Sequence, residues 1–259
     1  MPEKSIIYFV SDLHLGMESV EGSRERERIF IDWLNLVRKD AKEIWFLGDV
    51  FDYWFEYKRV VPRGYTRFLG KLAEISDEGI EIHYFTGNHD IWVFDYLPQE
   101  IGLTLHTEPI IQEFSGLKFF LGHGDGYSPK DYGYLFIKRV FRSRFLQWCY
   151  ARIHPNGATA FARWSSRTSR NSHQRLEYLG IEKEDIVLFA RRHIVDNPSI
   201  SFYLFGHRHL PFDVTISKNT RVICLGDWVY NFTYARFDGE KLELKKFLKE
   251  RGEIITDKV

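Results

Sequence analysis

Five short apolar segments of this chain each end in a turn that carries aspartate, asparagine or histidine. The first segment is Ile6–Val10, which is followed by Asp12 and His14. The later segments precede, in chain order, Asp49, Asn88 with His89, His123, and His207 with His209. Ligands of open α/β sheets gather at the carboxyl ends of the strands. The pattern therefore predicts an α/β protein in which these side chains converge on one site.

The segments between the first turns predict alternating strands and helices. Short apolar, β-rich runs at Ile6–Val10, 43–47 and 80–85 are expected to be buried strands. Residues 23–40 have apolar side chains at helical spacing, and residues 62–79 begin with a proline and end with a glycine, so each range is expected to be a helix. This βαβαβ order implies parallel strands that are joined by crossover helices.

The second half of the chain is richer in strand patterns. The runs 110–114 and 117–121 flank Ser115-Gly116 and are expected to form a hairpin. A further strand is expected at 201–205, and antiparallel strands with tight turns at 212–216, 221–225, 232–237 and 242–247. We expect residues 1–259 to form a single domain.

The residues at the strand ends suit divalent metals. Two carboxylates, four imidazoles and one amide favour a borderline cation, with Mn²⁺ first and Fe²⁺ or Zn²⁺ as alternatives. Seven donors are too many for one tetrahedral site, but they suffice for two cations that share a carboxylate. Two cations held roughly 3.5–4 Å apart favour in-line displacement at phosphorus. Because residues two apart in an extended segment point the same way, Asp12 with His14, and His207 with His209, are each expected to face one cluster.

One segment differs from the rest of the chain in charge. Residues 134–176 contain nine basic residues, eight aromatic residues and no acidic residue. The remainder carries 27 basic against 36 acidic residues, a net charge of −9. Pro155-Asn156-Gly157 is expected to divide the segment into two helices. We interpret it as a helical insertion that meets an anionic membrane surface, and the alternative is a helical hairpin on the core or a homodimer contact.

Composition excludes several other functions. Lysine and arginine number 36 and so do aspartate and glutamate, so a nucleic-acid partner bound through bulk positive charge is not expected. The two cysteines, Cys149 and Cys224, cannot form a disulfide framework and are compatible with a reducing compartment. The apolar run Ile6–Val10 is too short for a signal peptide, and no stretch is long enough to span a bilayer. We expect a cytoplasmic protein with peripheral membrane contact. The sequence indicates no oligomeric state.

The strand-end motifs resemble those of a known family. They are similar to the five signature blocks of the calcineurin-like metallophosphoesterases, as Asp12-Leu13-His14, Gly48-Asp49, Gly87-Asn88-His89-Asp90, Gly122-His123 and Gly206-His207-Arg208-His209. The resemblance implies a four-layer α/β/β/α sandwich. It also implies one metal on Asp12, His14, Asp49 and His209, and a second metal on Asp49, Asn88, His123 and His207.

A narrower resemblance is to the UDP-2,3-diacylglucosamine pyrophosphatases of lipid A synthesis, and it rests on residues 11–15, 48–54, 123–125 and the insertion. It implies cleavage of a lipid-linked nucleotide-sugar to UMP and 2,3-diacylglucosamine 1-phosphate, at the cytoplasmic face of the inner membrane. The implied substrate contacts are Asn88, His89, Asp131, Ser166, Arg170 and His173. The best-known members have arginine in place of His89, and a soluble nucleotide or phosphoester is the alternative substrate.

The expected mechanism needs no covalent intermediate on the protein. Two cations lower the pKa of water, and the resulting hydroxide attacks phosphorus in line. His89 is expected to be catalytic by stabilising negative charge on the phosphate or the leaving group. Asp90 is expected to orient His89 through a hydrogen bond, to cap a helix, or both. Asp52 and Asp125 are expected either to form hydrogen bonds with the metal-binding imidazoles or to be ordinary loop residues. A non-catalytic binding module is the third hypothesis, and the complete donor set argues against it.

Overall fold

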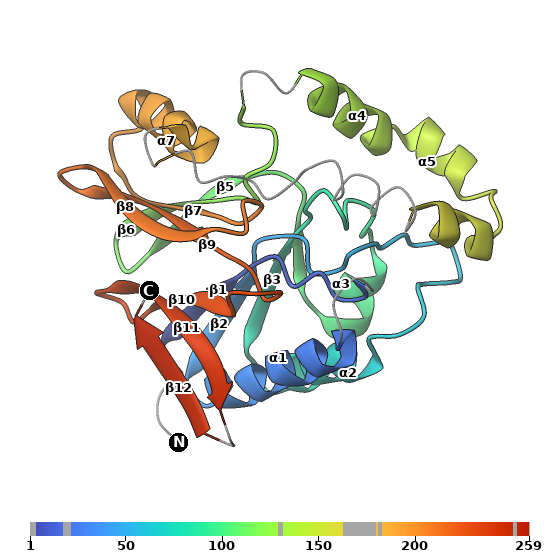
Figure 1. Ribbon diagram of the computed structural model, residues 1–259, viewed down its shortest axis with the longest axis horizontal. Helices are drawn as coiled ribbons and strands as arrows, with labels where there is room; N and C mark the ends of the chain where they lie inside the picture. Colours follow the sequence, from blue (N-terminus) through green and yellow to red (C-terminus); the bar gives the residue numbers. More distant parts are fainter. Residues whose placement is uncertain are drawn as a thin grey trace.

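Two β-sheets lie face to face in the computed structural model, which describes residues 4–17, 22–128, 132–162, 180, 183–250 and 253–258 (Figure 1). The seven-stranded sheet has the order β12 (Glu253–Lys258), β11 (Leu242–Glu250), β10 (Thr233–Phe237), β1 (Ile6–Val10), β2 (Ala41–Phe46), β3 (Glu81–Phe85) and β4 (Thr104–His106). The five-stranded sheet has the order β5 (Ile110–Phe114), β6 (Leu117–Leu121), β7 (Ile200–Phe205), β9 (Thr220–Leu225) and β8 (Pro211–Ser217).

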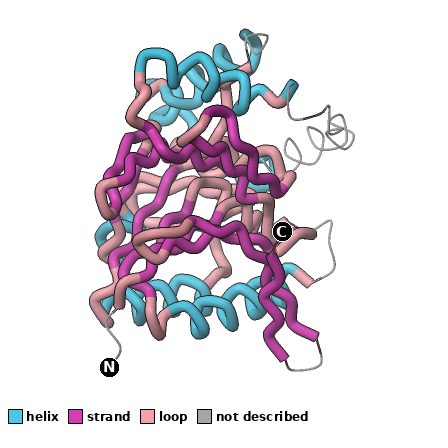
Figure 2. The backbone as a smooth tube through the Cα atoms, turned by 90° about the vertical axis from the view of Figure 1, so that its left-hand side faces the viewer, coloured by secondary structure: helices cyan, strands magenta, loops and turns pink. Residues whose placement is uncertain are grey.

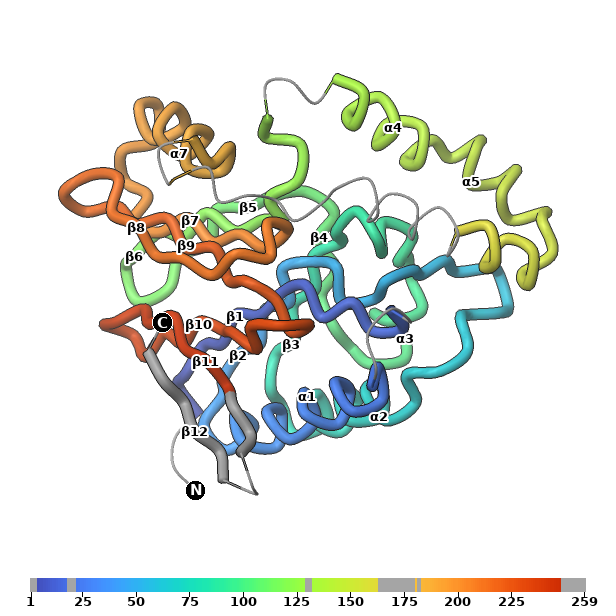
Figure 3. The backbone as a smooth tube through the Cα atoms, in the orientation of Figure 1, coloured from blue at the N-terminus to red at the C-terminus, as the bar shows by residue number. Residues whose placement is uncertain are grey.

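Helices cover the outer faces of both sheets (Figure 2). The seven-stranded sheet packs against α1 (Ser23–Val37), α2 (Thr66–Asp77) and α3 (Tyr96–Ile101). The five-stranded sheet packs against α7 (Asp185–Asp196). This order of layers confirms the four-layer α/β/β/α sandwich. Two further helices, α4 (Tyr132–Arg142) and α5 (Arg144–Tyr150), run along one side of the molecule outside these layers (Figure 3).

The layers are held together by three apolar clusters. Strand β1 shows how they arise, because all five of its residues are buried. Tyr8 and Val10 face the helices, whereas Ile7 and Phe9 face the second sheet. A strand covered on both faces needs a continuous apolar run, since successive side chains point to opposite faces. The first apolar run of the sequence therefore becomes a central strand, and its end lies deep in the molecule.

Most of the expected elements are present. Strands β1, β5 and β6 have the predicted bounds, and β1–β2 and β2–β3 are parallel as expected. Helix α2 begins four residues later than predicted, because Tyr65 has a φ of 60°, outside the right-handed helical region. The expectation for 221–225 was only partly right, since β9 is antiparallel to β8 but parallel to β7. The short elements α3 and β4, and the last strand β12, were not predicted.

The insertion contains more helices than expected. After α5 the chain turns at 151–154, and a third helix begins at Pro155 and continues to residue 162. The prediction of a turn at Pro155-Asn156-Gly157 was wrong, because proline is favoured in the first turn of a helix, where its missing N–H needs no partner. The part of the insertion beyond residue 162 lies outside the described residues. Among the helices that the structure describes, none has the length and apolar content to cross a membrane.

Candidate metal centre

The predicted strand ends meet at one place between the sheets. Three groups of side chains have donor atoms within 4.8 Å of one another, and they are Asp12 with His14 and His209, His14 with Asp49 and His89, and Asp49 with His123 and His207. The amide oxygen of Asn88 lies 3.2 Å from His123 Nε2 and 3.0 Å from His207 Nδ1. All seven predicted metal-binding residues are thus together, and Asp49 belongs to two of the groups.

The two carboxylates are held by backbone N–H groups. Asp12 Oδ2 accepts a hydrogen bond from His207 N at 2.8 Å, and Asp49 Oδ1 accepts one from His89 N at 2.8 Å. Each carboxylate therefore has one anchored oxygen and one that faces the site. Only glycine can stand at position 87, because a Cβ atom there would lie 2.2 Å from Asp49 Oδ1.

Buried polar atoms without partners face the middle of the site. Asp12 Oδ1 and His14 Nε2 are buried, make no hydrogen bond to a described residue, and lie 3.7 Å apart. Asp49 Oδ2 lies 3.7 Å from the same nitrogen and 3.3 Å from His123 Nε2. A buried polar atom without a partner costs free energy. Divalent cations among these atoms would satisfy them, so the donor set fits the metals that the sequence predicts.

The electrostatics of the site favour positive charge. Burial raises the pKa of Asp49, but the nearby imidazoles of His123, His89 and His14 together hold the pKa of this carboxyl well below its usual value. Burial lowers the pKa of His14, but the nearby carboxylate of Asp12 and other acidic neighbours raise it to about 10. In contrast, burial and the neighbouring His123 lower the pKa of His207 to about 4. The carboxylates therefore attract cations, and His207 presents a neutral imidazole, as metal coordination requires.

The imidazoles are oriented through their outer nitrogens. His123 Nδ1 donates to the backbone carbonyl of Leu47 at 2.8 Å, so Nε2 faces the site. His14 Nδ1 lies 3.4 Å from the carboxylate of Asp52, an ion-pair contact rather than a hydrogen bond. A hydrogen bond such as that of His123 fixes the tautomer and the orientation of a metal-binding histidine.

Asp227 is a functional residue that sequence reasoning missed. This buried carboxylate lies 3.2 Å from His209 Nδ1 through Oδ2. Its Oδ1 accepts backbone N–H groups from residues 229, 230 and 231. A signal was present, because Leu225-Gly226-Asp227 follows a strand in the same way as Leu47-Gly48-Asp49. The repeated Leu-Gly-Asp pattern identifies a second carboxylate, which follows a strand of the other sheet.

Asp90 does not orient His89, and that prediction was wrong. The Asp90 carboxylate accepts hydrogen bonds from the N–H groups of Val50, Phe51 and Gly87 and from the hydroxyl of Tyr84. It thereby ties the turn after β2 to the turn after β3. The predicted helix cap is also absent, since the next described helix, α3, begins only at residue 96. His89 Nδ1 instead donates to the backbone carbonyl of Asp52 at 3.0 Å.

The turns at this site are strained. Eight described residues other than glycine have positive φ angles, and five of them are predicted metal ligands, namely Asp12, His14, Asp49, His207 and His209. Such conformations cost on the order of 1–3 kcal/mol each and persist only where the surroundings impose them. The extended geometry expected for the two paired motifs was therefore wrong. As a result His207 and His209 belong to different groups, although Asp12 and His14 share one.

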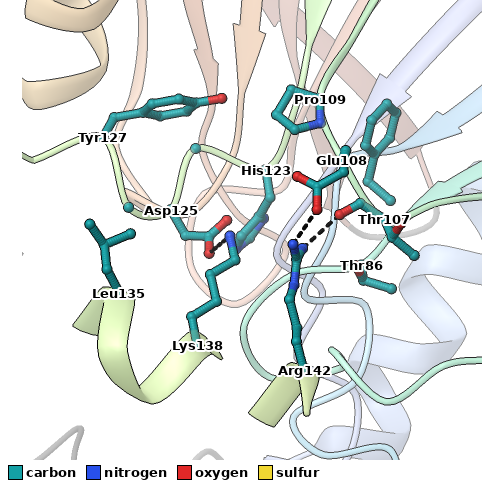
Figure 4. Close-up of a pocket in the computed structure, with 13 residues that line it drawn as sticks. Thr86, Thr107, Glu108, Pro109, His123, Asp125, Tyr127, Leu135, Lys138 and Arg142 are labelled. Carbon is teal, nitrogen blue, oxygen red and sulfur yellow. Dashed lines mark hydrogen bonds and ion pairs between the residues drawn. The ribbon is translucent and has the colours of Figure 1, made fainter. Parts of the chain in front are cut away.

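Helix α4 docks beside the site through two ion pairs (Figure 4). Lys138 Nζ lies 2.6 Å from Asp125 Oδ2, and the hydroxyl of Tyr134 donates to the same oxygen. Arg142 pairs with Glu108 and also donates to the backbone carbonyl of Thr107. Burial raises the pKa of Asp125, but His123 and Lys138 lower it to about 2. Asp125 therefore holds the insertion and makes no hydrogen bond to an imidazole of a described residue.

A pocket of about 290 Å³ lies between α4 and the metal centre. Its walls include His123 of the site, Asp125, and the two docked cations Lys138 and Arg142 (Figure 4). A substrate bound at the metals would therefore contact the insertion. The predicted substrate contacts Asp131, Ser166, Arg170 and His173 lie outside the described residues.

The fold and the donor set define a phosphoesterase. The family model of the calcineurin-like phosphoesterases matches residues 6–211, and the chain belongs to this family. It is therefore a metal-dependent phosphoester hydrolase.

Sequence relatives of the chain belong to a narrower group of phosphoester hydrolases. The chain is 44% identical over 255 residues to the UDP-2,3-diacylglucosamine hydrolase of Porphyromonas gingivalis, an alignment that covers 93% of this chain and 97% of the relative. It is 26% identical to the protein of the same name from Tolumonas auensis, over 91% of this chain and 94% of that one. Among solved structures, the Escherichia coli phosphoesterase Yfce aligns with a TM-score of 0.47 and 13% identity, over 98% of each chain.

Proposed function

We propose that this enzyme hydrolyses the pyrophosphate of UDP-2,3-diacylglucosamine to UMP and 2,3-diacylglucosamine 1-phosphate, a step of lipid A synthesis. The observation that carries the proposal is the cluster of metal donors in which Asp49 belongs to two groups. The chain that holds this cluster aligns almost end to end with the Porphyromonas gingivalis hydrolase. Paired cations are suited to displacement at phosphorus. The alignment covers 93% of this chain and therefore reaches into the insertion as well as the site, which supports a lipid-linked substrate.

The proposed metal ligands follow the groups in the structure. One cation would be held by Asp12, His14, Asp49 and His209, and the other by Asp49, Asn88, His123 and His207. Mn²⁺ is the first choice, and Fe²⁺ or Zn²⁺ also suit mixed oxygen and nitrogen donors. When bound, the cations would lower the pKa of water and neutralise charge on the phosphates. We propose the same single domain, residues 1–259, with 134–176 inserted in it.

We propose that His89 acts on the reacting phosphate. Its Nδ1 donates a hydrogen bond to the backbone carbonyl of Asp52, and its Nε2 makes no hydrogen bond to a described residue. The ring lies beside His14, with 4.8 Å between the ring centroids. From this position Nε2 would hold a proton at the oxygen that leaves phosphorus, which is general acid catalysis. Asn88, Asp131, Ser166, Arg170 and His173 are the other proposed substrate contacts.

The function is tested by the products of a defined assay. Purified protein with Mn²⁺ is incubated with UDP-2,3-diacylglucosamine in mixed micelles, with a dinucleoside polyphosphate, and with a small phosphodiester. We expect UMP from the lipid substrate at a kcat of about 1–10³ s⁻¹, and loss of turnover in EDTA. Release of UDP would contradict cleavage at the pyrophosphate. Efficient turnover of the soluble substrates alone would indicate that the enzyme acts on a soluble nucleotide or phosphoester instead of the lipid.

The exposed face of the insertion supports contact with the cytoplasmic face of the inner membrane. Phe136 and Phe145 are 67% and 69% exposed, and Trp148 is more than half exposed. Arg139 of α4 and Arg144 of α5 are also exposed. Apolar side chains flanked by basic ones bind the interface of an anionic bilayer, so the protein is proposed to be peripheral there.

The double variant Arg139→Glu/Arg144→Glu is expected to bind anionic vesicles at least about 30-fold more weakly than the wild type, since each arginine near the surface contributes about 1 kcal/mol. Turnover of the lipid substrate should fall with it, whereas turnover of the small phosphodiester should persist. Vesicle co-sedimentation at several salt concentrations checks the binding, because salt screens the attraction.

Arg142 provides the matched control. Its side chain pairs with Glu108 and with the carbonyl of Thr107, so Arg142→Glu should undock α4 and lower both activities. Parallel loss of both activities in the Arg139 and Arg144 variant would show a structural role for these residues. Failure of the wild-type protein to bind anionic vesicles would contradict the membrane proposal.

A further inference from the structure

We infer that the ion pair between the buried Glu184 and the partly buried Arg208 positions the turn that supplies His207 to one proposed metal and His209 to the other. Arg208 lies between His207 and His209 in the sequence. Its Nε donates to Glu184 Oε2 at 2.8 Å and its Nη2 donates to Glu184 Oε1 at 3.3 Å. The inference rests on one part of the proposed function, namely that His207 and His209 are metal ligands.

The Glu184 carboxylate is dedicated to this contact. Glu184 is only 1% exposed, and in the described part of the chain the hydrogen bonds to its carboxylate come from Arg208 alone. A glutamate at the start of a helix commonly interacts with the free N–H groups there. Glu184 precedes α7, but its side chain caps no N–H group of that helix. A buried carboxylate without such a role needs its cation, since an unpaired buried charge is costly.

Helix α7 gives the ion pair a rigid base. Ile186, Val187 and Ala190 are buried against the outer face of the five-stranded sheet. The backbone carbonyl of Glu184 accepts the N–H groups of Val187 and Leu188, both at 2.9 Å. The position of Glu184 is therefore set by the packing of α7, independently of the turn that carries Arg208.

The turn itself needs an outside restraint. His207 and His209 have φ angles of 65° and 54°, which residues other than glycine rarely adopt. The bidentate pair with Glu184 holds the residue between them. Because His207 faces the group with Asp49 and His209 faces the group with Asp12, a shift of this one turn would move donors of both groups. Glu184 and Arg208 thus act through the histidines, as positioning residues.

The test is the affinity for Mn²⁺, measured by isothermal titration calorimetry in the absence of substrate. Glu184→Gln removes the charge but keeps the size of the side chain. We expect Mn²⁺ binding about 10–100-fold weaker than in the wild type, as for other residues that orient metal ligands. Activity should recover when the Mn²⁺ concentration is raised. Unchanged affinity with lower thermal stability would overturn the inference, because the pair would then only attach α7.

A second variant guards against loss of folding. Glu184→Leu/Arg208→Met replaces the pair with apolar side chains, a change that is often tolerated in a protein interior. The same loss of Mn²⁺ affinity is expected in this variant, and wild-type affinity would overturn the inference. Asp213→Asn is the matched control, since it breaks the Asp213–Arg221 pair on β8 and β9 and should leave Mn²⁺ affinity unchanged. Wild-type protein that binds no Mn²⁺ would contradict the proposed function itself.

Discussion

Asp49→Asn is expected to lower kcat/KM by at least about 10³-fold, because the proposed cations supply several kcal/mol of transition-state stabilisation. Asp49 Oδ2 lies 3.7 Å from His14 Nε2 and 3.3 Å from His123 Nε2, so both proposed metals would draw on its charge. The asparagine retains an oxygen that can accept the hydrogen bond from His89 N. The turn should therefore keep its shape while both metals are lost or weakened. Metal content per chain after desalting checks this result.

Chelation separates this effect from a folding defect. Wild-type enzyme stripped with EDTA should regain activity when Mn²⁺ is added, whereas Asp49→Asn should not regain it at the same concentration. Circular dichroism should show the same secondary structure for both proteins. Two tightly bound ions and full activity in the variant would refute the role of Asp49 as the shared ligand, and one ion per fully active wild-type chain would refute the two-metal site.

His89→Ala is expected to lower kcat by about 10²–10⁴-fold with the metal content unchanged, the usual range for removal of a general acid. The metal site should survive because His89 anchors Asp49 Oδ1 through its backbone N–H, which alanine retains. What alanine loses is the imidazole whose Nδ1 is held by the carbonyl of Asp52. Metal analysis and steady-state kinetics on the lipid substrate measure the two quantities separately.

Two further substitutions define what the imidazole contributes. His89→Asn can keep a donor to the Asp52 carbonyl but cannot carry a proton to the substrate, so it should be as inactive as alanine. His89→Arg supplies a permanent positive charge in place of the imidazole, and substantial activity there would indicate that charge rather than proton transfer is required. Loss of metal from His89→Ala would show that the ring supports the metal centre, and an unchanged kcat would remove His89 from the mechanism.

The chemistry of the site was predictable because it lies in short motifs at strand ends. Apolar runs such as Ile6–Val10 predict strands buried on both faces, and the polar residues after them must then meet where the strands end. The reasons for the local geometry were less predictable. Asp12 and His14 share a group because both residues adopt left-handed backbone conformations in a turn, and not because they alternate along a strand.

Contacts between distant segments had the weakest signal in the sequence. Asp227 orients His209 from a strand end 18 residues further along the chain, and only the repeated Leu-Gly-Asp pattern indicated it. Asp90 was expected to orient His89, to cap a helix, or both, whereas it joins the turns after β2 and β3. Asp125 was expected either to contact an imidazole or to be an ordinary loop residue, whereas it receives Lys138 of the insertion. In each case several partners were chemically suitable.

The layers were expected only from a family resemblance, whereas the sequence by itself determined the parallel strands of the first half and the residue types of the candidate metal centre. These properties follow from hydrophobic periodicity and from the few residues that bind divalent cations, and both are local along the chain. Only the tertiary structure decided which carboxylate supports which imidazole, where the insertion docks, and that Glu184 reaches Arg208. A carboxylate can accept a hydrogen bond from any donor near it, so its partner is chosen by the packing that brings distant segments together.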